Sequence, residues 1–450
     1  MVTDDSVVDR RILVEARTLA RRGYHVILLA GGLADGSRFE RDGALCIERF
    51  SPSASEAMAR IRVNWRKLGK REAFLAAWLW PVHYLRPELL WLRRRIGKSY
   101  RALQYLIARA RGWKATRPVR DRLPSVLNIR ERWIIDRLVF YRPDVIHAHD
   151  LPQLRACAIA KRILRVPLIY DAHELYPEIH TLTARQSAEL AAQEQQYIRD
   201  ADVVITVNHL LASEFARRYP IEPPTVIWNA IDPPQDLFSS SGRPTLRSIL
   251  GIGEDRRILL YQGWMSWTRG LQDLVRALAK VDPAIHLVFL GYGDARDGLA
   301  AIARREGVAD RVHFLAAVPP DEMLYLTATA DAGIIPYQPT GLNSTLCSPN
   351  KLFEYIQAQL PIVANDLPFL REVIAGEGFG VVAPLCGPAG FAAAISAMFD
   401  MTQGGPARFK ATLASRAPRY AWTSQGGELT RIYDRWRVYR QACADGDECD

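Results

Sequence analysis

Apolar residues in the first half of the chain alternate between helical spacing and short continuous runs. Positions 12, 13, 16, 19 and 20 are apolar, which is the spacing of an amphipathic helix over 9–20. The continuous runs have the length of buried strands. They lie at 24–30, 145–149, 167–171, 203–207 and 225–228. Helices predicted at 154–164, at 184–199 and from Leu210 onward separate the later runs. This alternation predicts a parallel sheet of right-handed βαβ units.

The same alternation restarts after residues 232–243, which are rich in Pro, Ser and Asp and have the composition of an interdomain linker. The second set of predicted strands lies at 258–261, 286–290, 312–315, 332–335 and 361–364, with helices at 271–280, 321–329 and 351–359. Two such sets predict an α/β protein with two Rossmann-like domains facing a cleft, at 1–235 and 245–405. Ligands of these sheets bind outside the carboxyl ends of the strands.

Composition agrees with a folded protein of two domains. The chain has 450 residues, which is more than one core usually holds, and 49% of them are hydrophobic. Six scattered cysteines without a C-x-x-C pair indicate a reducing compartment. Residues 1–11 are polar and acidic, and no run of about 18 uncharged apolar residues exists. We therefore predict neither a signal peptide nor a membrane-spanning helix, and a cytoplasmic location.

Positive charge is concentrated in one block. Residues 60–142 carry a net charge of +17, so the rest of the chain sums to −7 within the total of +10. The block also holds six of the eleven tryptophans. Arg and Trp on amphipathic helices are typical of a membrane interface. We therefore predict a basic helical insertion at 55–140, with residues 60–140 in contact with anionic lipid. This contact predicts a peripheral position on the inner face of the cell membrane. Nucleic acid is disfavoured, because no nucleic-acid-binding motif accompanies the charge. An ordinary insertion with a solvated basic face remains open.

The most informative motif is Ser348-Pro349-Asn350-Lys351-Leu352-Phe353-Glu354, where a predicted helix begins. A helix N-terminus presents unpaired N–H groups and partial positive charge, which suits phosphate. Lys351 adds a full charge, and Glu354, one turn later, can accept hydrogen bonds from a ribose diol. Taken alone, the motif also fits a capped helix with a solvated Lys and Glu.

The longer string at 348–368, S-P-N-K-L-F-E-Y-I-Q-A-Q-L-P-I-V-A-N-D-L-P, closely resembles the retaining glycosyltransferases of family 4, group 1 type, which have the GT-B fold. In that family the second Glu of an E-x7-E pair holds the donor ribose, and Glu354 takes its place. The first Glu would fall at 346, where this chain has Leu346. The resemblance therefore assigns no carboxylate to the hydroxyls of the donor sugar.

Loops upstream of this string share the resemblance. Gly263 and Arg269 match the donor-phosphate segment, with Trp264 where the family commonly has a first arginine. An arginine fork suits a diphosphate. The resemblance implies a donor site that also includes Gly291, Tyr292, Pro319, Asn343, Ser348 and Asn350. The nucleoside diphosphate sugar is a substrate, so no cofactor is expected.

Two strings of the first half, 145–151 and 170–178, place histidines and acids at the carboxyl ends of strands. The resemblance implies that His173 lies against the transferred sugar with Glu174 nearby, as the catalytic pair. It leaves His149 and Asp150 for the acceptor side. Such clusters also suit metal ions, but no helical H-x-x-x-H spacing occurs and the family needs no metal. We therefore predict no metal site.

Both ends of the chain bear on the resemblance. The helix at 9–20 looks like the first helix of these enzymes, whose central strand and glycine loop should precede it. Only about eight residues do, so either the true start lies upstream of Met1 or the sheet is incomplete. Residues 406–442 look like the helices that cross back to the first domain, and Asn229-Ala230 matches an Asn-Gly hinge.

The function that the resemblance implies is transfer of a sugar, with retention, from a nucleoside diphosphate sugar to a hydroxyl of a lipid-linked or polysaccharide acceptor. A non-catalytic sugar-nucleotide-binding or assembly protein of the same fold is the alternative, motivated by Leu346 and the missing strand. An epimerase of this fold is disfavoured by the P-N-K-L-F-E string. The sequence does not specify the donor sugar, its base, the acceptor or the oligomeric state.

Overall fold

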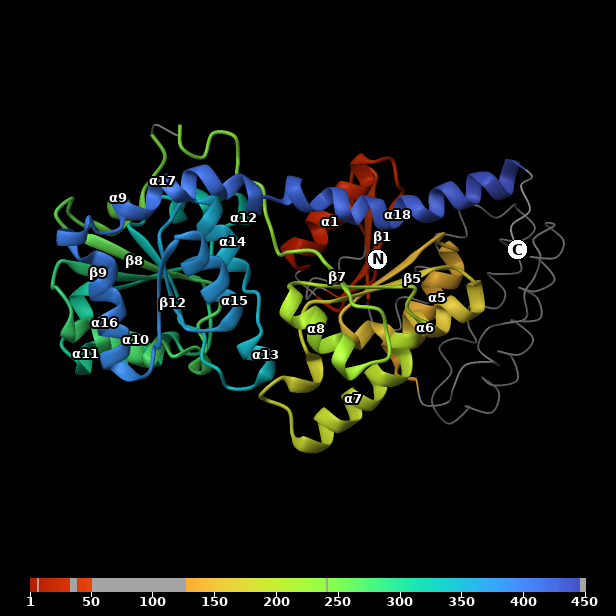
Figure 1. Ribbon diagram of the computed structural model, residues 1–450, viewed down its shortest axis with the longest axis horizontal. Helices are drawn as coiled ribbons and strands as arrows, with labels where there is room; N and C mark the ends of the chain where they lie inside the picture. The colour runs from red at the N-terminus through yellow and green to blue at the C-terminus, as the bar shows by residue number, and fades with distance from the viewer. Residues whose placement is uncertain (6–7, 33–38, 51–126, 240–241, 446–450) are drawn as a thin grey trace, which may run out of the picture.

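The computed structural model describes residues 1–5, 8–32, 39–50, 127–239 and 242–445. These residues form two α/β domains side by side, joined by the segment after residue 226 and by a long C-terminal helix (Figure 1). This confirms the predicted α/β class with two domains. Most of the predicted basic insertion at 55–140 lies outside the described residues, which include only its end from 127 onward.

The first domain contains a sheet in which most strands are parallel. One part has the order β1-β3-β2 and the other β4-β5-β6-β7. The strands are β1 (Val26–Ala30), β2 (Phe39–Asp42), β3 (Leu45–Arg49), β4 (Ile146–His149), β5 (Leu168–Ala172), β6 (Val203–Thr206) and β7 (Thr225–Val226). Strand β2 pairs antiparallel to β3. This hairpin was not among the predicted elements, because its outer strand β2 is exposed along its whole length and carries no apolar run.

Residue Val2 joins the two parts of this sheet. It bridges Leu29 of β1 on one side and Ala148 of β4 on the other, both in parallel. Its amide donates to the carbonyl of His147 at 2.8 Å, and its own carbonyl accepts from the amide of His149 at 2.9 Å. The position of the expected central strand is therefore held by the first residues of the chain, and one continuous sheet results.

Helices cover both faces of the first sheet. They are α1 (Arg10–Arg21), α5 (Ile129–Tyr141), α6 (Leu151–Leu164), α7 (Ala184–Tyr197) and α8 (His209–Arg218). Asp9 caps α1 by accepting from the amide of Arg11 at 2.7 Å. Helix α6 begins at Leu151, three residues before the predicted start, because Pro152 falls in the first turn, where a missing N–H has no cost.

The second domain is built on a six-stranded, fully parallel sheet of order β10-β9-β8-β11-β12-β13. Its strands are β8 (Arg257–Gln262), β9 (Ile285–Leu290), β10 (Val312–Leu315), β11 (Ala332–Ile335), β12 (Ile362–Asn365) and β13 (Gly380–Ala383). Its main helices are α10 (Leu271–Ala277), α11 (Arg296–Arg305), α12 (Pro320–Thr327), α14 (Asn350–Gln357), α16 (Gly387–Phe399) and α17 (Ala407–Arg416). Strand β13 lay outside the predicted set.

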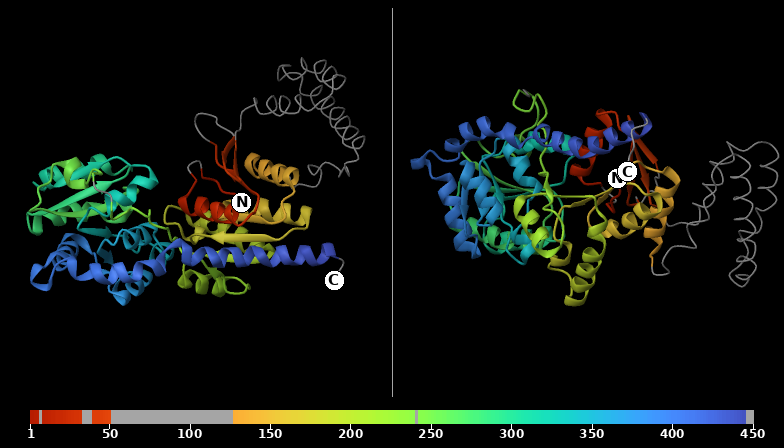
Figure 2. Two further views of the ribbon diagram at one scale, coloured as in Figure 1. Left: turned by 90° about the horizontal axis from the view of Figure 1, so that it is seen from above. Right: turned by 45° about the vertical axis from the view of Figure 1, so that its right-hand side comes forward.

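The C-terminal helix α18 (Trp422–Asp445) runs back along the first domain (Figure 2). The indole Nε1 of Trp422 donates to Thr18 Oγ1 at 2.7 Å, and the hydroxyl of Tyr24 donates to Asp434 Oδ1 at 2.7 Å. Thr18 belongs to α1 and Tyr24 follows it, so the C-terminal helix packs on the first helix of the chain. Within the described part of the chain, no helix combines the length and the apolarity that crossing a bilayer requires.

Candidate functional site

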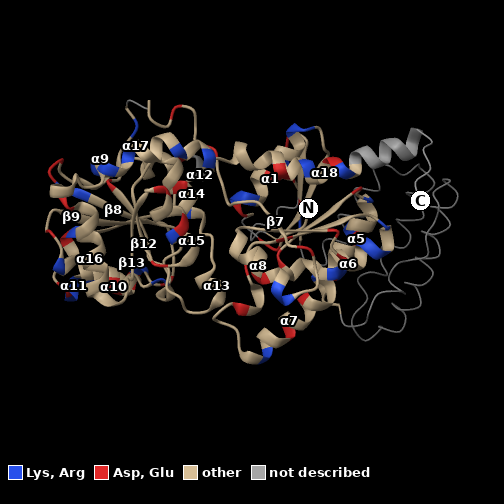
Figure 3. Cartoon of the chain, viewed as in Figure 1, with Lys and Arg blue, Asp and Glu red and all other residues tan. Residues whose placement is uncertain are grey.

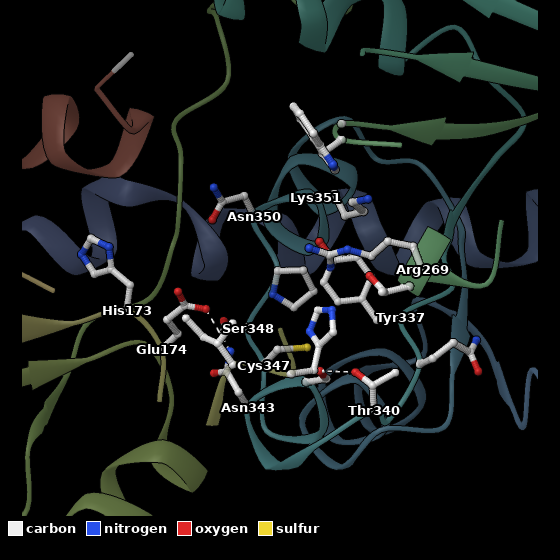
Figure 4. Close-up of a pocket in the computed structure, with 18 of the residues that line it drawn as sticks. His173, Glu174, Arg269, Tyr337, Thr340, Asn343, Cys347, Ser348, Asn350 and Lys351 are labelled. Carbon is white, nitrogen blue, oxygen red and sulfur yellow. Dashed lines mark hydrogen bonds between the residues drawn. The ribbon is translucent and has the colours of Figure 1, made fainter. Parts of the chain in front are cut away.

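A cavity of about 610 Å³ lies between the two domains, at the carboxyl ends of their strands. The first domain lines it with Asp9 and with residues that follow β5, including His173 and Glu174. The second domain lines it with the loop after β8 and with the start of α14. Figure 4 shows Arg269, Lys351 and Tyr337 together on the side of the second domain, across from His173 and Glu174.

Two cations of the second domain rest on aromatic rings. The Lys351 Nζ lies 3.9 Å from the ring centre of Tyr261 and 5.1 Å from that of Tyr337. The Arg269 Cζ lies 3.5 Å from the ring centre of Tyr337. Neither forms an ion pair with any carboxylate of the described residues. Two basic groups held on tyrosine rings, neither paired with a carboxylate of the described residues, have the arrangement that suits a multiply charged anion.

Burial leaves Lys351 short of compensating charge. Its exposed fraction is 6%. Burial, and next the positive charge of Arg269, hold the pKa of Lys351 well below its usual range. An anion bound between the two cations would supply the missing compensation and raise that pKa again.

Glu354 projects from α14 into the same cavity. Its carboxylate accepts a hydrogen bond from Gln262 Nε2, and Gln262 Oε1 in turn accepts from the Thr327 hydroxyl at 2.7 Å. Burial raises the pKa of Glu354, and the bond from Gln262 opposes that rise. Its orientation is therefore fixed by a buried chain of side chains, while the residue still lines the cavity.

The glycine loops after β8 and β9 pack directly on each other. Gly263 has φ of +106° and Gly291 has φ of +147°. A Cβ on Gly291 would lie 2.3 Å from the carbonyl oxygen of Gly263, so a side chain there would displace the loop that lines the cavity. The exposed rings of Trp264 and Tyr292 meet edge to face above these loops, with centroids 5.1 Å apart.

His173 of the first domain lies between two carboxylates. Its Nδ1 is 3.3 Å from Asp150 Oδ2, and its Nε2 is 3.1 Å from Asp171 Oδ2. Burial alone would lower its pKa, but the charges of Asp150 and Asp171 outweigh burial and hold the pKa of His173 well above its usual range. The two carboxylates therefore favour the charged imidazolium form of the ring.

A cluster of titratable groups lies beneath His173. Glu15, His147, His149 and Asp171 are fully buried, and each offers a ligand atom within 4.8 Å of the others. His147 and His149 stack with ring centroids 4.2 Å apart, and His147 Nδ1 lies 2.8 Å from the Tyr433 hydroxyl of α18. Burial lowers the pKa of both histidines, which favours their neutral form.

The positive charge in this cluster already comes from Arg11. Its guanidinium forms ion pairs with Glu15 and with Asp171, both at 2.9 Å. Burial and the neighbouring Asp171 raise the pKa of Glu15 to about 8, and the charge of Arg11 opposes that rise. Arg11 already donates to Glu15 Oε1 and to both oxygens of Asp171, so a divalent cation would compete with a buried guanidinium for these carboxylates.

We therefore expect purified protein to contain substoichiometric zinc and manganese and to keep its full activity after prolonged treatment with EDTA. Elemental analysis of the purified chain and an assay before and after chelation measure this. One bound metal ion per chain that is lost in a His147→Ala variant would contradict it, and would turn the four residues into a metal site.

Asparagines connect the two domains around the cavity. Asn343 Nδ2 donates to Glu174 Oε2 at 2.9 Å, and Asn343 Oδ1 accepts from the Leu175 amide at 2.9 Å. Asn208 Nδ2 donates to the carbonyl of Leu346 at 2.8 Å. Leu346 itself packs against the core of the first domain, so the residue that replaces the expected carboxylate is an apolar contact between domains.

The cavity brings together most of the predicted site residues. These are His173, Glu174, Gly263, Arg269, Asn343, Ser348, Asn350, Lys351 and Glu354. Five predicted residues do not line it: His149, Asp150, Gly291, Tyr292 and Pro319. His149 is buried behind His173, Asp150 positions the amide and ring of His173, and Gly291 and Tyr292 support the Gly263 loop.

The lining residues that were not predicted include Tyr337 and Gln262. Tyr337 follows β11 by two positions, so the rule that ligands bind at the carboxyl ends of strands could have identified it. Gln262 is the last residue of β8. Its contact with Glu354 joins positions 92 residues apart, which no local pattern encodes.

Family models match both halves of the chain. The model described as glycosyl transferases group 1 matches residues 256–401, and the model described as glycosyltransferase family 4 matches residues 98–235. Among relatives, an uncharacterised glycosyltransferase of Methanocaldococcus jannaschii is 29% identical over 247 residues, which cover 53% of this chain and 61% of the relative. The glycogen synthase of Mycobacterium tuberculosis is 26% identical over 302 residues, covering 65% of this chain and 69% of that protein.

Solved structures share the fold across nearly the whole chain. The sucrose-phosphate synthase from Thermosynechococcus elongatus gives a TM-score of 0.62 at 17% identity, covering 97% of this chain and 96% of its own. The Anabaena protein HepE in complex with UDP-glucose gives 0.62 at 16% identity, covering 96% and 98%. At these identities the likeness concerns the fold alone.

Proposed function

This chain belongs to the family 4, group 1 glycosyltransferases and has the GT-B fold, and from that premise we propose that it transfers a sugar, with retention, from a nucleoside diphosphate sugar to a hydroxyl acceptor. The observation that carries the proposal is the pair Lys351, in the first turn of α14, and Arg269, in the loop after β8; neither is ion-paired with a carboxylate among the described residues. The complex of Anabaena HepE with UDP-glucose supports a donor of this chemical class.

In the proposed reaction, the bond between C1 of the sugar and the diphosphate oxygen breaks, and a bond from C1 to the acceptor oxygen forms on the same face. Negative charge grows on the leaving diphosphate, where Lys351, Arg269 and the first N–H groups of α14 stabilise it. The acceptor proton passes to an oxygen of that diphosphate. His173, as an imidazolium, and Glu174 position the sugar from the first domain.

We further propose that the nucleotide part of the donor lies against Glu354, with its ribose diol donating to the carboxylate. Release of nucleoside diphosphate from UDP-, GDP- and dTDP-sugars tests the function directly. Thermal stabilisation by each donor, measured first, selects the sugar nucleotide to use. No release with any stabilising donor, in the presence of lipid-linked and polysaccharide acceptors, would overturn the proposal.

The proposed acceptor is lipid-linked or a growing polysaccharide, and the proposed location is the cytoplasmic face of the membrane. The support is the net charge of +17 in residues 60–142, most of which lie outside the described residues. The remainder of the chain carries −7, and its acidic and basic residues are interspersed over both domains (Figure 3). Sedimentation with anionic and with neutral vesicles tests this part, and equal binding to both would contradict it.

Leu346 favours a second candidate function, a sugar-nucleotide-binding protein that does not catalyse transfer. Its side chain packs into the first domain and offers no hydrogen bond to a donor sugar. This candidate predicts that a nucleotide sugar stabilises the chain without any release of nucleoside diphosphate. Glu174, which lines the cavity and is held by Asn343, is the carboxylate that the transferase proposal offers to the sugar instead.

Binding of a nucleoside diphosphate should weaken as the pH rises. In the free protein the pKa of Lys351 is lowered by burial and by Arg269, whereas a bound diphosphate raises it. Between these two pKa values binding takes up a proton, and affinity falls by up to about tenfold per pH unit. Calorimetry with UDP at rising pH, in two buffers of different ionisation enthalpy, measures the affinity and the proton uptake.

The matched variant for this prediction is Lys351→Arg, whose side chain stays charged throughout the range. Its affinity should vary less with pH than that of the natural chain. A profile of the same slope in both proteins would assign the pH dependence to another group.

A further inference from the structure

One buried guanidinium contacts elements from three separate parts of the chain. Arg11 of α1 has a side chain that is 3% exposed. Its Nε donates to Glu15 Oε1 at 2.9 Å, and its Nη2 donates to both oxygens of Asp171 at 2.9 and 3.0 Å. Its Nη1 donates to the carbonyl of Ile227 at 2.7 Å and to Asn229 Oδ1 at 2.9 Å. The whole donor fork is therefore occupied.

The contacts of Arg11 lead to both sides of the cavity. On one side, the Asp171 carboxylate that Arg11 holds lies 3.1 Å from Nε2 of His173. On the other side, Asn229 Nδ2 donates to the carbonyl of Ser348 at 2.8 Å. Ser348 lines the cavity two residues before α14, in the segment that carries Lys351. Contacts through Asp171, Arg11 and Asn229 thus connect His173 with the Ser348–Lys351 loop of the other domain.

The geometry of these contacts needs a planar fork. A guanidinium presents five N–H groups in one rigid plane, whereas a lysine ammonium is a single rotatable point charge. Arg11→Lys would keep the buried charge beside Asp171 but lose the second arm that reaches Ile227 and Asn229. The contacts depend on shape as well as charge, which separates them from a simple buried ion pair.

We propose that Arg11 is a positioning residue, which fixes His173 relative to the Ser348–Lys351 loop so that the sugar and its leaving group are aligned across the two domains. This inference rests on the proposed transferase function. Arg11 does not line the cavity, so it acts through Asp171 and Asn229. Nucleotide binding depends on Glu354 and Lys351 of the other domain and is expected to be independent of it.

The experiment compares Arg11→Lys and Asn229→Ala with the natural chain. Each variant should lower kcat for release of nucleoside diphosphate by roughly 100-fold, the size of effect that a misplacement of about 1 Å produces. The Kd for UDP should change less than about twofold in both variants, since a twofold change is only about 0.4 kcal/mol. Arg17→Lys, on the exposed face of the same helix, is the matched control and should keep full turnover.

Two further measurements separate positioning from loss of fold. The double variant should lose little more than either single variant, because both break the same connection; losses that multiply would overturn the proposal. Arg11→Ala should regain turnover with added guanidinium but not with ammonium at equal concentration, and no rescue would overturn it as well. If the natural chain binds UDP but releases no nucleoside diphosphate from any donor, the proposed transferase function is refuted. If the natural chain is active and the Arg11 and Asn229 variants keep the same kcat, only the role of Arg11 is refuted.

Discussion

Replacing Glu354 with alanine is expected to lower kcat/KM for the nucleotide sugar by about three orders of magnitude, since each hydrogen bond to a charged group contributes about 1.5–3 kcal/mol and a ribose diol offers two. The carboxylate is held by Gln262, which is itself held by Thr327, so it is oriented before the donor arrives. Because the side chain is already oriented, donor binding costs little conformational entropy at Glu354.

The variant also leaves Gln262 Nε2 without its acceptor in a buried position, so part of the loss could come from the fold. Glu354→Gln is therefore measured alongside, together with the melting temperature of each protein. Glu189→Ala, at an exposed position on α7, is the control and should behave like the natural chain. Donor turnover at the natural rate in a folded Glu354→Ala protein would refute the site assignment.

The alternation of strand and helix was visible in the sequence because parallel strands buried on both faces are continuous apolar runs. Strand β11 is buried along its whole length and has the bounds that its apolar run predicts, at 332–335. The edge strand β10 also has its predicted bounds, at 312–315, although only Val312 is buried. The hairpin of β2 and β3 escaped detection because β2 is exposed on both faces, and its residues follow no burial pattern. Local periodicity therefore identified strands with continuous apolar runs and missed the exposed outer strand β2.

The candidate site divides in the same way. Lys351 and Glu354 stand three residues apart on one helix, so a single string reveals both. Arg11 meets Asp171 across 160 residues and Asn229 across 218, and a sequence pattern carries no signal for contacts of that separation. Arg11 is a charged residue of the predicted amphipathic helix at 9–20, yet it is among the most buried charges of the described chain.

Leu346 shows how structure changes the meaning of a departure from a family pattern. In the sequence it is a missing carboxylate. In the fold it packs with Leu342 against the core of the first domain, while its carbonyl accepts from Asn208. The position that would have contacted the sugar instead stabilises the approach of the two domains, and Glu174 faces the cavity from the opposite side.

The second large effect is expected at the two cations. Lys351→Ala and Arg269→Ala should each lower kcat by roughly 10²–10³, the loss typical when one group that stabilises developing negative charge is removed. Both groups lie on Tyr337, so they face the same region, where the proposed diphosphate would be within reach of both. Lys280→Ala, at an exposed position after α10, is the matched control and should leave kcat unchanged.

The two variants should differ in one respect. Arg269 contributes to lowering the pKa of Lys351, so Arg269→Ala should raise that pKa and move the alkaline decline of donor binding to higher pH. Lys351→Ala should remove the decline altogether. The pH dependence of kcat and of the UDP Kd in both variants measures this, and an unchanged alkaline decline in Lys351→Ala would show that another group titrates. Arg269 is proposed to stabilise the leaving group and also lowers the pKa of Lys351. Its removal is therefore expected to change both kcat and the pH profile, whereas removal of a purely structural residue would not shift the pH profile.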